Sequence, residues 1–181
     1  MGMVPPRVFA VTGTPGSGKT TLCAHFEAQG YAVESVLDLA KRFDCLGEED
    51  ASDGAAPVDV HKLAEAWIDE SEGTVFVDGH LSHLLEIDAI ILIRCHPDVL
   101  QQRLEERGYN EAKVRANVEW EMIAGTWSEI LEFELDVPVL EVDAGLATSE
   151  VLASEILQWI DDGCPSDGVE ATASEAIDWL A

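Results

Sequence analysis

Five short runs of apolar and β-branched residues recur along the chain, and longer stretches with helical spacing separate them. The runs cover residues 7–12, 31–34, 74–78, 89–95 and 137–143. Most are apolar at nearly every position, which is the pattern of strands buried on both faces of a sheet. Strands that alternate with helices predict an α/β fold in three layers, with a parallel sheet of about five strands and helices on both faces.

The intervening segments carry apolar residues at helical spacing and are bounded by helix caps. We predict helices over four of them: 59–70, 97–107, from about 110 to beyond 123, and 149–160. Asp59 is a suitable N-cap, Pro97 occupies a first helical position, and Gly108 follows a helix end. Gly125 is expected to break the third helix.

The residues after the first predicted strand have the spacing G-x-x-x-x-G-K-[ST]. They read Gly13-Thr14-Pro15-Gly16-Ser17-Gly18-Lys19-Thr20. In such a P-loop the backbone N–H groups turn toward a polyphosphate, Lys19 reaches the β and γ phosphates, and the Thr20 hydroxyl holds Mg²⁺. A helix expected to start at Gly18 directs its positive dipole end at the same anion. A chance glycine-rich turn would not need a strand before it and a helix after it.

A second candidate group follows the third run. Asp78 stands at the carboxyl end of an apolar strand, which is the Walker B position for a residue that holds Mg²⁺ beside Thr20. His80 is placed to accept or orient a proton near a γ-phosphate. The alternatives are that Asp78 caps a helix and that His80 packs at its start. His83 forms an H-x-x-H pair with His80, but without a third ligand this pair does not favour zinc.

The chain is strongly acidic, with 36 Asp and Glu against 10 Lys and Arg and a formal net charge of −26. One interpretation is adaptation to a salt-rich cytoplasm, where counter-ions screen the repulsion. The alternatives are an ordinary acidic protein or a disordered acidic segment, although the 47% apolar content argues against global disorder. Strong direct binding of nucleic acid is not expected, because phosphate contacts need a basic surface.

The cations are concentrated in the first two thirds of the chain. All ten precede residue 116, whereas residues 116–181 contain 16 carboxylates. This distribution suggests phosphate contacts at Lys41 and Arg42 and within the basic cluster of Arg103, Arg107, Lys113 and Arg115. Ion pairs of Arg103 and Lys113 with neighbouring Glu residues are the alternative.

The four cysteines lie far apart in the chain and form no C-x-x-C pair. They indicate reduced thiols in a cytoplasmic protein. The longest apolar runs have strand length and no leader precedes them, so we expect neither export nor association with a membrane.

Several motifs taken together resemble the small adenylate kinase family of archaea and eukaryotic nuclei, whose members also act as ATPases in maturation of the small ribosomal subunit. The matching stretches are residues 13–21, 38–41, 77–80 and 103–110, followed by Lys113 and 117–119. The resemblance covers about residues 7–162 and implies a P-loop fold of the nucleoside monophosphate kinase type.

The resemblance also implies roles for individual residues. The ATP phosphates would be bound by Gly13, Gly16, Ser17, Gly18, Lys19, Thr20 and Thr21. A segment over 35–56 would close over AMP or a related monophosphate, and a lid over 106–116 would clamp ATP through Arg107. Asp78 and Thr20 would hold Mg²⁺, and His80 matches the suspected catalytic histidine. Lys41 stands where relatives often have Arg and offers no planar fork, so Arg42 is the candidate substitute.

We therefore expect an ATP:AMP phosphotransferase with ATPase activity. Two alternatives stay open: an ATPase that remodels a basic small-subunit ribosomal protein and the pre-ribosome, or a kinase for a different small molecule. The kinase core is expected to span 1–162. Residues 163–181 are expected to form an acidic linker and a short helix over 174–180, which only docking would order and which catalysis would not need.

If the charge of −26 reflects salt adaptation, the midpoint of thermal unfolding should rise from low salt to molar KCl. The physical reason is that the Debye length falls to about 3 Å at 1 M, so like charges no longer repel each other over the surface. Circular dichroism at increasing KCl concentration measures this midpoint. A stability maximum near zero salt would contradict the interpretation.

Overall fold

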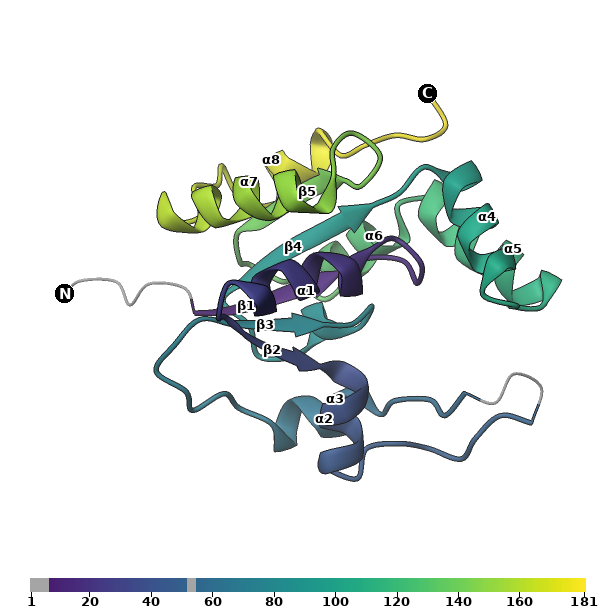
Figure 1. Cartoon of the computed structure of the whole chain (residues 1–181), viewed down its shortest axis with the longest axis horizontal. Coiled ribbons are helices and arrows are strands. Elements are labelled where there is room, and N and C mark those ends of the chain that lie inside the picture. The colour runs from purple at the N-terminus through teal and green to yellow at the C-terminus, as the bar shows by residue number, and fades with distance from the viewer. Residues whose placement is uncertain (1–6, 52–54) are drawn as a thin grey trace.

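The computed structural model describes residues 7–51 and 55–181, so residues 52–54 of the predicted monophosphate-binding segment lie outside the described residues. Its centre is a parallel sheet of five strands in the order β2-β3-β1-β4-β5 (Figure 1). The strands are β1 (Val8–Thr12), β2 (Ala32–Ser35), β3 (Val75–Asp78), β4 (Ala89–Arg94) and β5 (Val139–Asp143). This arrangement confirms the predicted parallel sheet, with each strand within two residues of its expected start.

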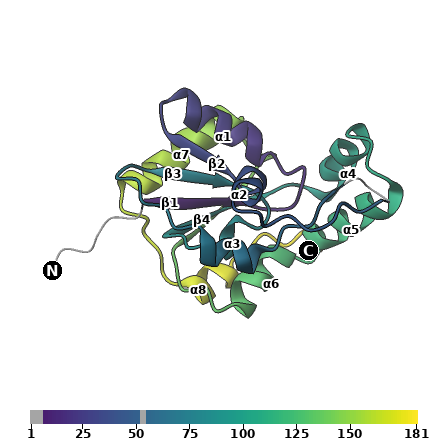
Figure 2. The same cartoon turned by 90° about the horizontal axis from the view of Figure 1, so that it is seen from below.

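Helices cover both faces of the sheet, which gives the three predicted layers (Figure 2). One face is covered by α1 (Lys19–Ala28) and α7 (Ser149–Asp161). The other face is covered by α2 (Val36–Arg42), α3 (Val60–Ala66), the 3₁₀ helix η1 (Ser82–Leu84), α6 (Gly125–Glu132) and α8 (Val169–Ser174). The pair α4 (Pro97–Glu106) and α5 (Glu111–Met122) extends beyond the carboxyl edge of the sheet (Figure 1).

The connections out of two neighbouring strands locate the site. β1 pairs with β3, and β1 leads into α1 on one face whereas β3 leads into η1 on the other. Parallel strands whose connections diverge in this way leave a crevice outside their carboxyl ends, where ligands bind in open α/β sheets. The P-loop and Asp78 both lie at these ends.

An aromatic stack holds the first helix against the sheet. Phe26 of α1 stacks on Phe76 of β3 with ring centroids 3.9 Å apart, and Phe9 of β1 lies 5.5 Å from the same ring. All three side chains are fully buried. Because α1 is rigidly packed, the loop that joins β1 to α1 has fixed ends.

Two predicted helices have different bounds in the structure. α3 ends at Ala66 instead of residue 70, because Trp67 adopts an extended backbone and its side chain is buried in the core beneath α2 and α3. The third predicted helix breaks at Ala124, which has a φ of 52°, and continues as α6.

The predicted helix over 174–180 is wrong. The tail helix is α8, Val169–Ser174, and Ser174 is its last residue and not its N-cap. The chain beyond it is not helical, because Ile177 and Trp179 form polar contacts with buried side chains of the core. The tail is thus ordered by docking.

Each of the four cysteines is free and buried. Burial raises the pKa of the Cys23 and Cys95 thiols, and it raises that of Cys164 to about 11. Within residues 7–51 and 55–181, no helix has the length and apolar character needed to cross a membrane.

Candidate active site

The P-loop has a backbone that only glycine fits at two positions. Gly13 has a φ of 138°, and a Cβ there would lie 2.3 Å from the Ile93 carbonyl oxygen of β4. Gly16 has a φ of 89°, and its Cβ would lie 2.9 Å from Leu104 of α4. The loop therefore packs closely between β4 and α4, which leaves its inner side shaped for an anion.

Lys19 is folded back onto this loop. Its Nζ donates hydrogen bonds to the carbonyl oxygens of Gly13 at 2.8 Å and Thr14 at 2.9 Å, and the residue is 8% exposed. Burial lowers the pKa of Lys19 to about 8; the Asp78 carboxylate opposes this shift, and Arg107 adds to it. A negative phosphate placed beside this amine would favour the charged form.

Thr20 and Asp78 meet across the crevice. The Thr20 hydroxyl donates to Asp78 Oδ2 at 2.8 Å. A hydroxyl and a carboxylate oxygen side by side, next to a phosphate site, are the ligands that Mg²⁺ uses when phosphates and waters supply the rest. The alternative that Asp78 caps a helix is wrong, because the following helix is η1 and its N-cap is Leu81.

His80 lies beside Lys19 and Asp78 in the loop after β3. The residue is exposed, yet loss of water around the ring, together with the charges of Lys19 and His83, lowers its pKa to about 4, and the Glu129 carboxylate opposes this shift. His80 is therefore neutral at pH 7.

His83 is not at the site but is buried in the core, where it helps to hold the loop after β3 that carries His80. Its ring is fully buried, with Nδ1 2.7 Å from the Thr12 hydroxyl and Nε2 2.9 Å from Glu129 of α6. Thr12 also donates to the backbone oxygen of His80 at 3.2 Å. The H-x-x-H pair thus divides into one histidine at the site and one structural partner.

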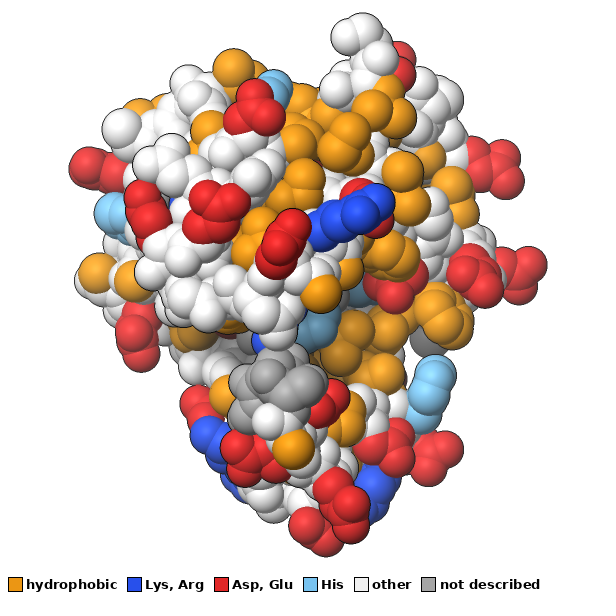
Figure 3. All heavy atoms as spheres, turned by 90° about the vertical axis from the view of Figure 1, so that its right-hand side faces the viewer, with side chains coloured by type: hydrophobic (Ala, Val, Ile, Leu, Met, Phe, Trp, Pro, Cys, Tyr) orange, Lys and Arg blue, Asp and Glu red, His pale blue; other side chains and the backbone are white. Residues whose placement is uncertain are grey.

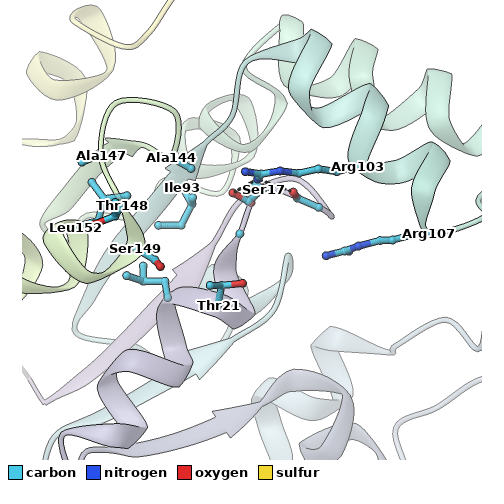
Figure 4. Close-up of a pocket in the computed structure, with 13 residues that line it drawn as sticks. Ser17, Thr21, Ile93, Arg103, Arg107, Ala144, Ala147, Thr148, Ser149 and Leu152 are labelled. Carbon is cyan, nitrogen blue, oxygen red and sulfur yellow. Dashed lines mark hydrogen bonds between the residues drawn. The ribbon is translucent and has the colours of Figure 1, made fainter.

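Arg103 of α4 and Arg107, the C-cap of this helix, reach toward the P-loop (Figure 4). Arg103 Nη1 donates to the carbonyl oxygens of Gly16 and Ser17, each at 3.3 Å, so its contacts are with the P-loop. Arg107 lines the same cavity, whose volume is about 390 Å³. Both cations thus stand where phosphate charge would accumulate.

The far side of this cavity is less polar. It is lined by Ile93 at the end of β4, Ala144 and Ala147 after β5, and Thr148, Ser149 and Leu152 at the start of α7 (Figure 4). The P-loop contributes Gly16, Ser17, Gly18 and Thr21 to the lining. A cavity that is polar at one end and largely apolar at the other suits a phosphate chain joined to a flat base.

Lys41 and Arg42 stand apart from this cavity. Both are exposed on α2, where Lys41 Nζ lies 3.6 Å from Asp38 and Arg42 Nη2 lies 3.3 Å from Glu34. The guanidinium of Arg42 also lies 5.6 Å from the Phe43 ring. A monophosphate bound here would have to draw these cations away from their carboxylate partners.

Several buried residues that hold the P-loop in place were not predicted from the sequence. Thr14 and Glu121 form a buried hydrogen bond, and Arg94 binds the same carboxylate. A signal was available for both charges: Arg94 ends an otherwise apolar strand, and Glu121 continues the inward stripe of Val114 and Val118 on α5. A charged residue on a buried stripe indicates a paired interior charge.

The fold places the chain in the class of P-loop kinases. Shikimate kinase from Acinetobacter baumannii matches with a TM-score of 0.58 at 13% identity, covering 88% of this chain and 94% of that chain. Deoxyadenosine kinase from M. mycoides matches with a TM-score of 0.51 at 17% identity, covering 86% and 99%. At these identities the likeness establishes the fold.

Sequence comparison identifies the family. A family model described as AAA domain matches residues 10–124. A protein of Archaeoglobus fulgidus named "Putative adenylate kinase" is 37% identical over 176 residues, covering 96% of this chain and 92% of its own. A protein of the same name from Methanocaldococcus jannaschii is 34% identical over 175 residues, covering 94% and 96%. The chain belongs to the AAA-domain family and to the family of these archaeal proteins.

The pKa of Lys19 predicts how ATP affinity depends on pH. Below about pH 8 the amine is charged and attracts phosphate, and above it the neutral amine dominates. Between pH 7 and pH 9 the dissociation constant for ATP should rise about tenfold, because the protonated fraction falls by that factor. Isothermal titration calorimetry measures this constant.

A Lys19→Arg variant is the matched control, because its guanidinium keeps its charge throughout this range. Its dissociation constant should be nearly independent of pH. An equal slope in both proteins would assign the pH dependence to another group.

Proposed function

We propose that the protein transfers the γ-phosphoryl group of ATP to AMP and forms two molecules of ADP. The observation that carries this proposal is that Lys19, the Thr20–Asp78 pair and Arg107 lie close enough to interact, beside a nucleoside-sized cavity that Arg107 and the P-loop line. The names of the archaeal relatives support the same reaction. ATP would place its phosphates against the P-loop and its base between the P-loop and the start of α7.

The proposed chemistry is positioning and charge stabilisation. During transfer, the bond between the γ-phosphorus and the β,γ-bridging oxygen breaks, and a bond forms between the γ-phosphorus and a phosphate oxygen of AMP. Lys19 and Arg107 stabilise the charge on the phosphoryl oxygens. Arg103 holds the P-loop through its carbonyl oxygens. Mg²⁺ held by Thr20 and Asp78 would supply further positive charge when bound.

His80 is suited to orienting a reactant and not to stabilising negative charge. Because its pKa is about 4, the ring is neutral at pH 7 and presents one donor and one acceptor nitrogen. In that form it can orient the acceptor phosphate. It can also hold a water molecule in line, which would give the ATPase activity.

The proposed acceptor site lies on the α2 side of the crevice. α2 begins beside the loop that carries His80, because Gly79 is in such close contact with Val36 that a Cβ would lie 2.5 Å from the Val36 side chain. Lys41 and Arg42 are the nearest cations on this helix that the resemblance assigns to AMP. Closure of the segment around 35–56 would bring them to the phosphate and exclude water.

The acidic surface supports a second role as an ATPase that acts on a basic protein of the small ribosomal subunit. Acidic side chains are scattered over the whole visible face in Figure 3, and Lys or Arg appear in only a few places. A surface of this sign favours arginine-rich protein over bare RNA. ADP formation with AMP, compared with phosphate release with and without such a protein, separates the two roles.

Replacement of Lys19 by Ala should abolish ADP formation and phosphate release alike, because the transferring phosphate loses its main cation. The reduction should be at least about 100-fold, in line with removal of one preorganised charge. Arg7→Ala, which removes a cation paired with Asp69 at 3.6 Å just before β1, at the end of the sheet opposite the P-loop, is the control and should retain activity. Retained activity in the Lys19→Ala protein, with an unchanged circular dichroism spectrum, would refute the P-loop assignment.

Replacement of His80 by Ala should lower kcat by about tenfold or more and leave the KM for ATP within about twofold, as expected for a group that orients reactants. Steady-state kinetics with ATP and AMP measures both constants. Unchanged kcat with a lower midpoint of thermal unfolding would show that His80 is structural.

A further inference from the structure

Three charged side chains are buried together between the sheet and α5. Arg94 at the end of β4 is 1% exposed and Glu121 of α5 is 3% exposed. Arg94 Nε donates to Glu121 Oε1 at 2.7 Å, and its Nη1 donates to Glu141 Oε1 of β5 at 2.6 Å. One cation between two carboxylates leaves excess negative charge, so burial of this group requires further hydrogen-bond donors.

The C-terminal tail supplies two of these donors. Trp179 Nε1 donates to Glu121 Oε1 at 2.9 Å, and the backbone N–H of Ile177 donates to Glu141 Oε2 at 2.9 Å. The Ile177 carbonyl in turn accepts from Arg94 Nη1 at 3.1 Å. Figure 1 shows the chain end running from α8 toward the side of the molecule where α4 lies. The tail therefore completes the buried charge group.

The second oxygen of Glu121 connects this group to the P-loop. Thr14 donates its hydroxyl to Glu121 Oε2 at 2.5 Å, and both residues are buried. The Thr14 carbonyl accepts from Lys19 Nζ at 2.9 Å and from the N–H of Ser17 at 3.1 Å. One carboxylate thus holds the tail through one oxygen and the phosphate-binding loop through the other.

Trp179 also contacts the start of α4, the helix that carries Arg103 and is followed by Arg107. Its ring lies edge-on to His96 with centroids 5.2 Å apart, and His96 is the N-cap of α4. The Arg94 guanidinium lies 5.7 Å from the Trp179 ring. A single tail residue therefore contacts both supports of the proposed ATP site.

We propose that Glu121 is a positioning residue for the P-loop and that Trp179 fixes Glu121 in the orientation that holds Thr14. Glu121 Oε1 accepts from Arg94 Nε at 2.7 Å, from the Cys95 N–H at 3.3 Å and from Trp179 Nε1 at 2.9 Å. Without the indole N–H it loses one of these three donors, so the carboxylate is less well fixed and Thr14 is held less firmly. Residues 175–180 then belong functionally to the ATP site, contrary to the expectation from sequence that catalysis would not need the tail. The proposal rests on the proposed function in taking ATP as the ligand of the P-loop.

The test replaces Trp179 by Phe in the full chain, which keeps an aromatic ring and removes the N–H donor. Trp159→Phe is the matched control, because Trp159 on α7 donates its indole N–H to the Pro165 carbonyl at 3.1 Å, away from the P-loop. The dissociation constant of Mg²⁺–ATP and the KM values for ATP and AMP are measured for wild type and both variants.

Trp179→Phe should weaken ATP binding by about three- to tenfold and raise the KM for ATP alone, as loss of one hydrogen bond to a charged group allows. The KM for AMP should not change, and Trp159→Phe should match wild type in every constant. A purely structural role for Trp179 would lower the active fraction and kcat without changing either KM. Equal ATP binding by the two variants would overturn the proposal.

Hydrogen exchange without nucleotide gives a second measurement that does not depend on turnover. In Trp179→Phe, the amides of residues 13–20 should exchange faster than in wild type, while those of β3 remain protected. Faster exchange in both regions, or in neither, would overturn the proposal. Failure of the wild-type protein to bind ATP would instead refute the proposed function and leave the exchange result to decide this inference.

Discussion

The ion pair between Arg94 and Glu121 is the interaction on which the arrangement of the site depends. It joins strand β4 to α5, and through Glu121 it reaches both the P-loop and the C-terminal tail. A buried charge that loses its partner costs several kcal/mol, roughly 3–5 by general experience. The elements that meet here therefore have little freedom to move independently, which is what a phosphate site needs if its donors are to be in place before the substrate arrives.

The site concentrates positive charge within a protein of net charge −26. Arg103 and Arg107 line the polar end of the cavity, and Lys19 follows the P-loop residues that line it. Burial lowers the pKa of Lys19 before any phosphate is bound. A nucleotide phosphate reverses this effect, because its charge compensates for the water that the amine has lost. Because the surface of the protein is acidic, these few cations form a local positive region that attracts an anionic substrate.

The fold and the P-loop were predictable from sequence because both depend on local patterns. Apolar runs marked all five strands, and the G-x-x-x-x-G-K-[ST] spacing fixed the loop that follows β1. The tail was not predictable in the same way. The pattern from Ser174 favoured a helix, but the hydrogen bonds of Ile177 and Trp179 with Glu141 and Glu121 outweigh the gain from a short, marginal helix. Those partners are 36 and 58 residues away, so no window of sequence contains the cause.

The lack of cations after residue 116 constrains how the C-terminal third packs. Its buried or half-buried carboxylates include Glu121, Glu129 and Glu141, and no Lys or Arg of the same third is present to pair with them.

The partners come from two other sources. Arg94 and His83 lie on earlier parts of the chain, as do the neutral donors Thr14 and the Cys95 N–H. Within the same third the donors are neutral groups: the indole N–H groups of Trp127 and Trp179 and the backbone of Ile177. Neutral donors satisfy a carboxylate without a second charge that would itself need pairing. Because the carboxylates of α5, α6 and β5 pair with Arg94 or His83, this third of the chain depends on the first two thirds for its fold. The same dependence links the last residues of the chain to the loop that holds Lys19.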